Sequence, residues 1–175
     1  RAYIFGVTKL VEAKKEHKVI SIEYEMIQME QTIDRLVRGA GSWYVHGQVT
    51  QGFTHQGQVL GAGVGPSGNQ QDFKILLIDQ KTQLKYGFSL RRVVHNNDYL
   101  HITFQDLDKR KRYWTDLSVG LEAGGVYKRF IVEGQFTYIY ALNYQWELLN
   151  ELTGPMIQGN NQTNIFLGIK TIYQF

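Results

Sequence analysis

Three side chains with acid–base chemistry stand close together in one short segment. His95 and Asp98 belong to the run HNND, and Ser89 lies in the stretch that leads into it. General acid–base catalysis needs such groups within hydrogen-bond reach of one another and of a bound substrate. HNND is also a good turn sequence, because Asn and Asp tolerate a left-handed backbone and hydrogen-bond to it locally. We interpret the run as a turn and predict no catalytic residues.

The sequence gives only weak indications of a metal site or a phosphate-binding loop. His46 and His55 are isolated, with no carboxylate at the spacing of a metal site. The glycine-rich region 51–71 contains GAGVGPSG, but a phosphate-binding glycine motif must follow a buried strand and open a helix. Pro66 and Asn69 instead indicate a turn. The sequence therefore predicts a glycine-rich loop region and neither a cofactor nor a metal.

Aromatic and histidine side chains are the residues best suited to bind a sugar. A pyranose has apolar C–H faces that stack on aromatic rings, and its hydroxyls hydrogen-bond to polar side chains. Each candidate could equally belong to an interfacial aromatic belt or pack against the wall of the protein. The candidates are Trp43, Tyr44, His46, Phe53, His55, Trp114, Tyr144 and Trp146. The loop 150–162 and the basic run 108–112 also suit contact with glycan.

The elements that must position these residues are strands. In the last stretch, 163–175, apolar or β-branched residues occupy every second position, which is the period of a strand with one apolar face. Tyr173 and the terminal Phe175 share that face. Such an ending resembles the C-terminal strand of outer-membrane β-barrels, where the aromatic residue is part of an assembly signal. An edge strand of a soluble β-sandwich would show the same period.

Alternation of the same kind recurs along most of the chain. It predicts strands at 2–11, 19–26, 42–50, 73–77, 84–91, 100–105, 113–122 and 130–140, and the turns are expected at 79–81, 95–98 and 123–125. Short turns between consecutive strands predict an antiparallel meander. Between 26 and 38 the apolar residues instead recur at helical spacing, which predicts a short amphipathic helix that packs against or plugs the sheet.

Charged residues fall on the opposite side of these strands. Glu23 and Glu25 share one face of their strand, and carboxylates facing lipid would be costly, so this face is expected to line a wet lumen. The other charged residues expected to face the lumen are Lys85, Arg91, Asp116, Glu122, Arg129, Glu133 and Lys170.

Composition narrows the class of protein. The 175 residues are 43% hydrophobic and 20% charged, which suits a soluble domain but also a membrane barrel, where only every second strand residue faces lipid. No apolar run approaches the ~20 residues that a membrane helix needs. The chain has no cysteine, which excludes a disulfide framework and a thiolate zinc site. A net charge of +3 is too small and scattered to indicate nucleic-acid binding.

Strand length decides between the two folds. Strands of soluble sandwiches usually have about five or six residues, whereas several strands here reach the ~9–11 residues that a tilted membrane strand needs. Aromatic residues, including many of the 11 Tyr, cluster toward strand ends, as interfacial belts do. We predict an all-β antiparallel meander forming an outer-membrane transmembrane β-barrel. The chain begins at Arg1 without a signal-peptide pattern, so we interpret it as a mature or truncated piece.

Several blocks carry a family resemblance. The runs SWYVHGQVTQGFTHQGQVLGAGVGPSGN, LRRVVHNND, YWTDLSVGL and LNYQW occur in this order before the terminal aromatic. They resemble the C-terminal part of Wzi-type capsule assembly proteins, particularly those of Bacteroidetes-like bacteria, over residues 42–175. The resemblance implies an eighteen-stranded outer-membrane barrel that acts as a surface lectin. This chain can supply only about eight to ten strands, so it is either the C-terminal fragment of a larger barrel or a smaller sheet that needs partners. We expect the fragment, with 1–175 as one barrel domain.

Two functions therefore remain. In the first, a non-enzymatic barrel in the bacterial outer membrane binds or helps assemble capsular polysaccharide through loop aromatics. In the second, the barrel is a porin-like channel or an outer-membrane hydrolase with His95 as its base. The expected partners are capsular polysaccharide, outer-membrane lipid, the barrel assembly machinery and an N-terminal barrel half or other outer-membrane proteins, with no nucleic acid.

Overall fold

A computed structural model describes residues 2–13, 17–30, 54–55, 58–59, 63–96, 113–146 and 159–174. Strands make up nearly all of this part of the chain. They are β1 (Tyr3–Ala13), β2 (Lys18–Gln28), β3 (Thr54–His55), β4 (Gln58–Val59), β5 (Asn69–Asp79), β6 (Leu84–Val94), β7 (Thr115–Tyr127), β8 (Phe130–Leu142) and β9 (Gln162–Tyr173), with a short 3₁₀ turn, η3 (Tyr144–Trp146).

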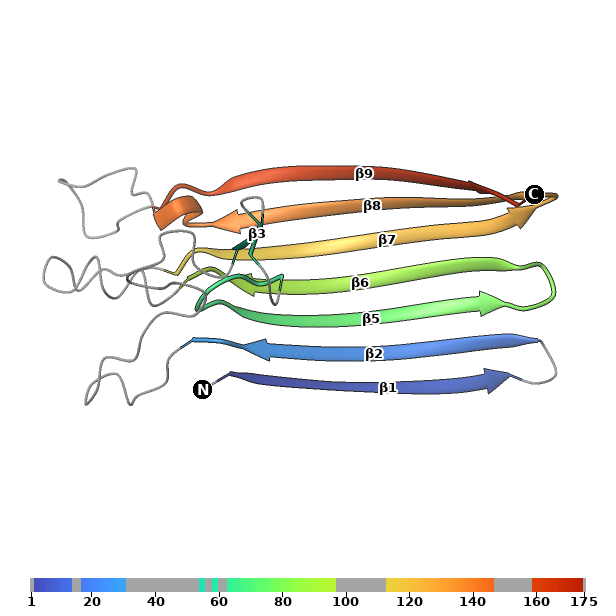
Figure 1. Ribbon diagram of the computed structural model, residues 1–175, viewed down its shortest axis with the longest axis horizontal. Helices are drawn as coiled ribbons and strands as arrows, with labels where there is room; N and C mark the ends of the chain where they lie inside the picture. The colour runs from blue at the N-terminus through green and yellow to red at the C-terminus, as the bar shows by residue number, and fades with distance from the viewer. Residues whose placement is uncertain are drawn as a thin grey trace, which may run out of the picture.

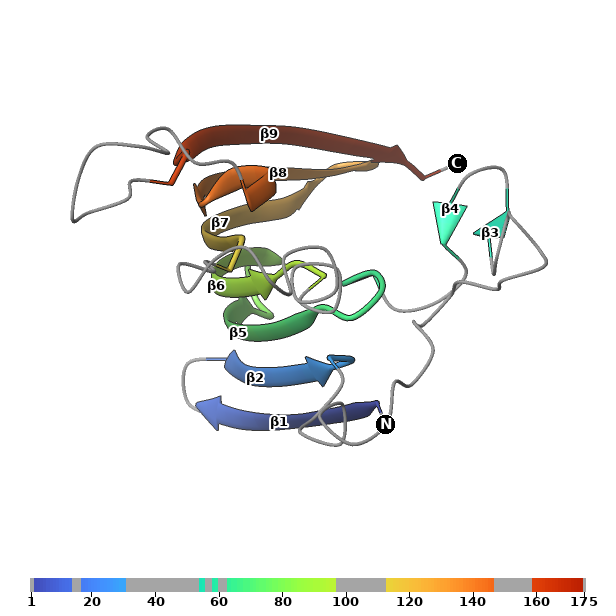
Figure 2. The same cartoon turned by 90° about the vertical axis from the view of Figure 1, so that its left-hand side faces the viewer.

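Seven of the strands form one antiparallel sheet in the order β1-β2-β5-β6-β7-β8-β9 (Figure 1). Each strand pairs with the next long strand along the chain, and β3 pairs only with β4. β1 and β9 lie at opposite edges of the open sheet (Figure 2). The predicted all-β antiparallel meander is confirmed, and its closure into a barrel remains a prediction.

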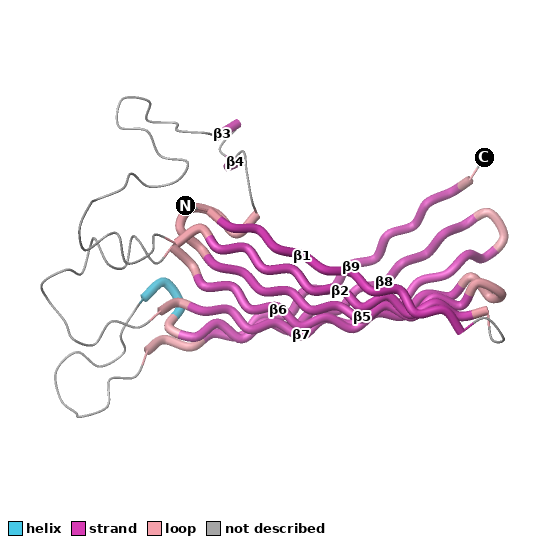
Figure 3. Tube along the Cα trace, turned by 90° about the horizontal axis from the view of Figure 1, so that it is seen from below, coloured by secondary structure: helices cyan, strands magenta, loops and turns pink. Residues whose placement is uncertain are grey.

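The strands are long and the sheet is twisted. Strands of the large sheet have 11 to 13 residues, which at about 3.3 Å per residue spans roughly 36–43 Å. Figure 3 shows the strands diverging toward the ends of the sheet, as the right-handed twist of strands requires. With the ~40° tilt of barrel strands, this length matches a hydrocarbon layer of about 25–30 Å.

The connections alternate in length between the two ends of the sheet. At one end, 14–17, 80–83 and 128–129 join neighbouring strands, and at the other end the joining segments are 29–68, 95–114 and 143–161. In Figure 1 the strand ends joined by the short connections lie at the end where the C-terminus is marked, and the strand ends joined by the long ones lie at the end where β1 begins. We refer to these as the short-turn end and the long-loop end.

Register divides the side chains into two faces. One row of opposed residues reads Tyr24, Phe73, Leu90, Val119, Tyr138 and Ile165, and the next row on the same face reads Ile22, Ile75, Phe88, Leu121, Phe136 and Leu167. The row between these carries Glu23, Lys74, Ser89, Gly120, Thr137 and, on β9, Phe166. Because successive side chains alternate across a strand, the sheet has one apolar face and one polar face.

The apolar face of this single-layered sheet is exposed. On it Leu121 is 53%, Leu167 74% and Ile169 86% exposed, while on the polar face the Glu122 side chain is 24% and the Lys170 side chain 66% exposed. Among the described residues, the one buried hydrophobic cluster is Ile27, Met29 and Val64, at the long-loop end. No second layer of described residues covers the apolar face.

Helices contribute little to this architecture. Within the ranges that the structure describes, no helix has the length and apolar character needed to cross a membrane.

Asp79 organises the connection between β5 and β6. Its Oδ1 accepts hydrogen bonds from the Thr82 N–H (3.1 Å) and the Lys81 N–H (2.9 Å). The hydrogen bond from Thr82 is the main cause that holds the pKa of Asp79 below its ordinary value. The turn predicted at 79–81 is thus confirmed, with β6 beginning at Leu84.

Two expectations about local structure need correction. Residues 123–125 do not form a turn, because β7 continues through them to Tyr127 and the connection is 128–129. The helix expected at 26–38 does not begin at Met26, since β2 extends to Gln28, and 31–38 lie outside the described residues. The strand expected at 100–105 lies outside the described residues, and within the sheet β6 pairs directly with β7. The strand expected at 42–50 lies outside the described residues.

Candidate functional site

The polar face gathers most of the charged residues expected to face a lumen. Register puts six of the seven on this face: Lys85, Arg91, Asp116, Glu122, Glu133 and Lys170. The exception is Arg129, which lies in the turn between β7 and β8, where its Nη1 donates to the Tyr173 hydroxyl at 3.4 Å. Glu23 and Glu25 share the polar face with Lys74 and Asp72 opposite them.

One ion pair crosses an intervening strand. Lys74 Nζ of β5 lies 3.0 Å from Glu122 Oε2 of β7, although β6 runs between these strands. The residue of β6 opposite Glu122 is Gly87, and a Cβ there would lie 2.7 Å from Glu122 Oε1. Glycine therefore leaves the space in which the carboxylate reaches over β6 to its lysine.

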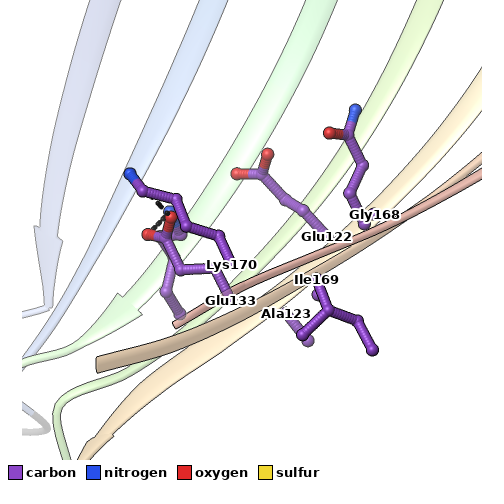
Figure 4. Close-up of a pocket in the computed structure, with 9 residues that line it drawn as sticks. Glu122, Ala123, Glu133, Gly168, Ile169 and Lys170 are labelled. Carbon is purple, nitrogen blue, oxygen red and sulfur yellow. Dashed lines mark hydrogen bonds and ion pairs between the residues drawn. The ribbon is translucent and has the colours of Figure 1, made fainter. Parts of the chain in front are cut away.

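A second pair repeats this arrangement one strand further along the sheet. Lys85 Nζ of β6 lies 2.9 Å from Glu133 Oε1 of β8, and Gly124 of β7 stands opposite both residues. Lys170 of β9 lies 3.7 Å from the other oxygen of Glu133. Figure 4 shows Glu122, Glu133 and Lys170 on one side of the ribbons and Ala123 and Ile169 on the other. These charges border a cavity of about 200 Å³.

An aromatic cluster lies at the long-loop end of the same face. The rings of His95 and Trp114 stack with centroids 3.9 Å apart. His95 Nε2 lies 2.7 Å from Asp116 Oδ2, and Trp114 Nε1 donates to Asp116 Oδ1 at 3.0 Å. One carboxylate at the start of β7 thus fixes the orientation of both rings.

Two further rings from the end of β8 complete the cluster. Tyr144 and Trp146 meet the Trp114 ring edge-on, with centroids 5.2 and 5.3 Å from it. Gln145 and Trp146 have φ of 52° and 58°, in the left-handed region that bulky residues rarely adopt. Asn143 anchors this turn, because its Nδ2 donates to the Tyr113 carbonyl at 3.0 Å. Strained backbone held in this way is often found at functional sites.

A cavity of about 220 Å³ lies beside the cluster. Asp116 and Tyr144 line it together with Gln162, Thr163 and Asn164 at the start of β9. The cavity thus offers a carboxylate, a phenol and two amides to hydroxyl groups, next to aromatic rings. Gln162 is the last residue of the loop 150–162 that was expected to contact glycan, whereas Asn164 was missed, because an ordinary polar residue near a strand start gives no signal of its own.

The predicted sugar-binding residues have different outcomes. Trp114, Tyr144 and Trp146 are brought together in this cluster. Trp43, Tyr44, His46 and Phe53 lie outside the described residues, and His55 is described only as part of β3. Of the two residues of the expected assembly signal, Tyr173 packs on Phe130 with ring centroids 5.1 Å apart, and Phe175 lies outside the described residues.

The described residues do not form the arrangement that a hydrolase with His95 as its base would need. His95 contacts Asp116, whereas Ser89 precedes it by six residues along β6, roughly 20 Å at about 3.3 Å per residue. Asp98 lies outside the described residues. Nor do the described residues contain a group of three or more His, Asp or Glu side chains that could hold a metal ion.

Comparisons with known proteins give no relative. No protein-family model, curated protein or solved structure matches this chain.

Proposed function

We propose that this chain forms part of the wall of an outer-membrane β-barrel and binds capsular polysaccharide at its long-loop end, in the manner implied by its resemblance to Wzi-type capsule assembly proteins. The observation that carries the membrane assignment is the exposed apolar face. Hydrocarbon is the environment in which Leu121, Leu167 and Ile169 can remain uncovered by protein. Short turns at one end and long connections at the other are also typical of such barrels.

Support for glycan binding comes from the aromatic cluster and its cavity. Tyr144 presents a half-buried ring beside Asp116, and Gln162 and Asn164 supply amides in the same cavity. Ring faces and hydrogen-bonding groups side by side are the combination that sugars require. The cluster also unites three of the blocks that carry the family resemblance, since His95, Trp114 and Tyr144 come one from each.

Binding of the producing strain's capsular polysaccharide to the protein in outer-membrane vesicles tests this function. We expect Tyr144→Ala to weaken binding by about threefold to tenfold, because it removes one aromatic contact worth roughly 0.5–1.5 kcal/mol. Asn164→Leu should weaken it as well, because a cavity-lining amide becomes apolar. Tyr86→Ala is the matched control, since Tyr86 is an aromatic on the apolar face.

Failure of the unchanged, membrane-inserted protein to bind this polysaccharide would refute the proposed lectin function. Equal binding by the Tyr144→Ala, Asn164→Leu and Tyr86→Ala proteins would refute the site. Heat-modifiable electrophoretic mobility of each variant checks that the barrel is folded.

A porin-like channel is the second candidate, because charged residues in pairs line the polar face from β5 to β9. Such a surface suits a hydrated lumen. Single-channel conductance in planar bilayers distinguishes the two: stepwise currents would support the channel, and a closed bilayer with full glycan binding would exclude it.

A further inference from the structure

Two consecutive arginines of β6 lie on opposite faces of the sheet. Arg91 is on the polar face, where its Nε contacts Asp72 Oδ1 of β5. Arg92 is on the apolar face, exposed, and its Nη1 donates weakly to the Gln71 side chain at 3.4 Å. Within the described part of the chain, Arg92 has no carboxylate partner. A guanidinium stays charged at all physiological pH values, so Arg92 presents an uncompensated cation on this face.

The surroundings of Arg92 form a groove of about 440 Å³ on the apolar face. Tyr24, Phe73, Leu90, Val119 and Tyr138 line the groove one row closer to the middle of the sheet than Arg92. Tyr140 stands in the same row as Arg92, at the rim. The groove therefore combines an apolar floor with a cationic upper edge at the long-loop end.

We propose that this groove binds a lipid of the outer leaflet that carries a phosphorylated headgroup, with the phosphate at Arg92 and an acyl chain along the row of Phe73, Leu90 and Val119. Charge complementarity selects this occupant: Arg binds phosphate oxygens in bidentate fashion, and the apolar floor continues inward from it. A zwitterionic lipid would bring its own cation close to Arg92. The inference rests on the proposed membrane assignment and is independent of glycan binding.

Comparison with Lys9 shows which features distinguish the position of Arg92. It too lies on the apolar face, on β1 opposite Ile22, but it does not line this groove. A lone cation on the apolar face can reach the headgroup region by extending its side chain. A lipid site needs the apolar groove as well, and the structure provides that beside Arg92.

Native mass spectrometry of the intact protein, titrated with phosphatidylglycerol and phosphatidylcholine of identical acyl chains, tests the proposal. We expect phosphatidylglycerol to bind more tightly, and Arg92→Gln to weaken its binding about tenfold or more. Arg91→Gln removes equal charge from the neighbouring residue whose side chain lies on the polar face, and Lys9→Gln removes it from β1 on the apolar face; both should leave the affinity unchanged. Val119→Trp, which fills the groove, should weaken binding of both lipids, and inorganic phosphate should not displace phosphatidylglycerol.

Each opposite result overturns the proposal. Unchanged affinity in Arg92→Gln, or an equal loss in Arg91→Gln, would show that the headgroup is not held at Arg92. Displacement by inorganic phosphate would indicate an anion site without a lipid tail. Wild-type lipid affinity in the Val119→Trp protein would show that the acyl chain does not lie in the groove. Reconstitution into vesicles is measured first: failure of the protein to insert together with the strands that close its sheet refutes the membrane assignment itself. Insertion with equal lipid affinities refutes only this site.

Discussion

At the scale of single residues, glycines determine which charges can meet. Gly87 leaves room for Glu122 to reach Lys74, and an added Cβ would lie 2.7 Å from Glu122 Oε1. We expect Gly87→Ala to destabilise the protein by about 1–3 kcal/mol, as overpacking does. Gly134→Ala is the matched control, because the nearest atom to its Cβ would be 3.9 Å away. Urea unfolding in detergent measures both, and equal stabilities would contradict this account.

A double variant, Gly87→Ala with Glu122→Ala, distinguishes a steric clash with Glu122 from an intrinsic effect of alanine on strand stability. Glu122→Ala removes the side chain that the new Cβ would meet, so Gly87→Ala should cost much less in that background. An undiminished cost would mean that the space above Gly87 is not needed by Glu122.

Residue types identified part of the candidate site but not its assembly. Trp114, Tyr144 and Trp146 were predicted as sugar contacts from their chemistry, and the structure brings them together. His95 was interpreted as a turn residue, yet it contacts Asp116, which is 21 positions away. That contact depends on the register between β6 and β7, and register is a property of two strands that neither strand's own sequence specifies.

At the scale of elements, the turn from β5 to β6 should respond to acid. The pKa of Asp79 is lowered, so its carboxylate contributes stability that is present above the ordinary value of 3.8 and is lost only as the pH falls below it. We expect the amide proton shifts of Lys81 and Thr82 to titrate with a midpoint below pH 3.8. Asp79→Asn keeps an acceptor oxygen but cannot titrate, so these changes should disappear. A transition centred above pH 4 in the unchanged protein would contradict the assignment.

Most strands could be predicted because alternation is local, and the errors arose where it was interrupted. β2, β5, β6, β8 and β9 follow the predicted period of two. The run Ala123–Gly125 has the composition of a turn but lies within β7, where Gly124 faces Glu133 and a Cβ at Gly125 would lie 2.7 Å from Leu84 Cδ2. Glycine gives room there to side chains of neighbouring strands, and sequence reasoning along one segment does not consider those side chains.

At the scale of the whole molecule, the seven-stranded sheet is incomplete as a membrane structure. A spanning sheet must satisfy all backbone groups, which requires closure. In a meander of seven strands the edge strands β1 and β9 run in the same direction. Antiparallel closure therefore needs an odd number of further strands between these edges, from another segment or another chain. This parity holds for any membrane barrel built from the sheet, and the larger barrel implied by the resemblance to Wzi-type proteins stays a prediction.

The environment of the two faces can be measured directly along β7. The chain has no cysteine, so single cysteines can carry a nitroxide label at consecutive positions without a background. In vesicles, we expect oxygen dissolved in the bilayer to reach labels at Leu117, Val119 and Leu121, and a water-soluble nickel chelate to reach Ser118, Gly120 and Glu122 instead, because these two sets lie on the apolar and polar faces. Collision rates with a period of two residues would establish lipid on one side and water on the other. If both sets were equally protected from oxygen and nickel, protein would have to cover both faces, and the apolar surface of this sheet would be an internal one.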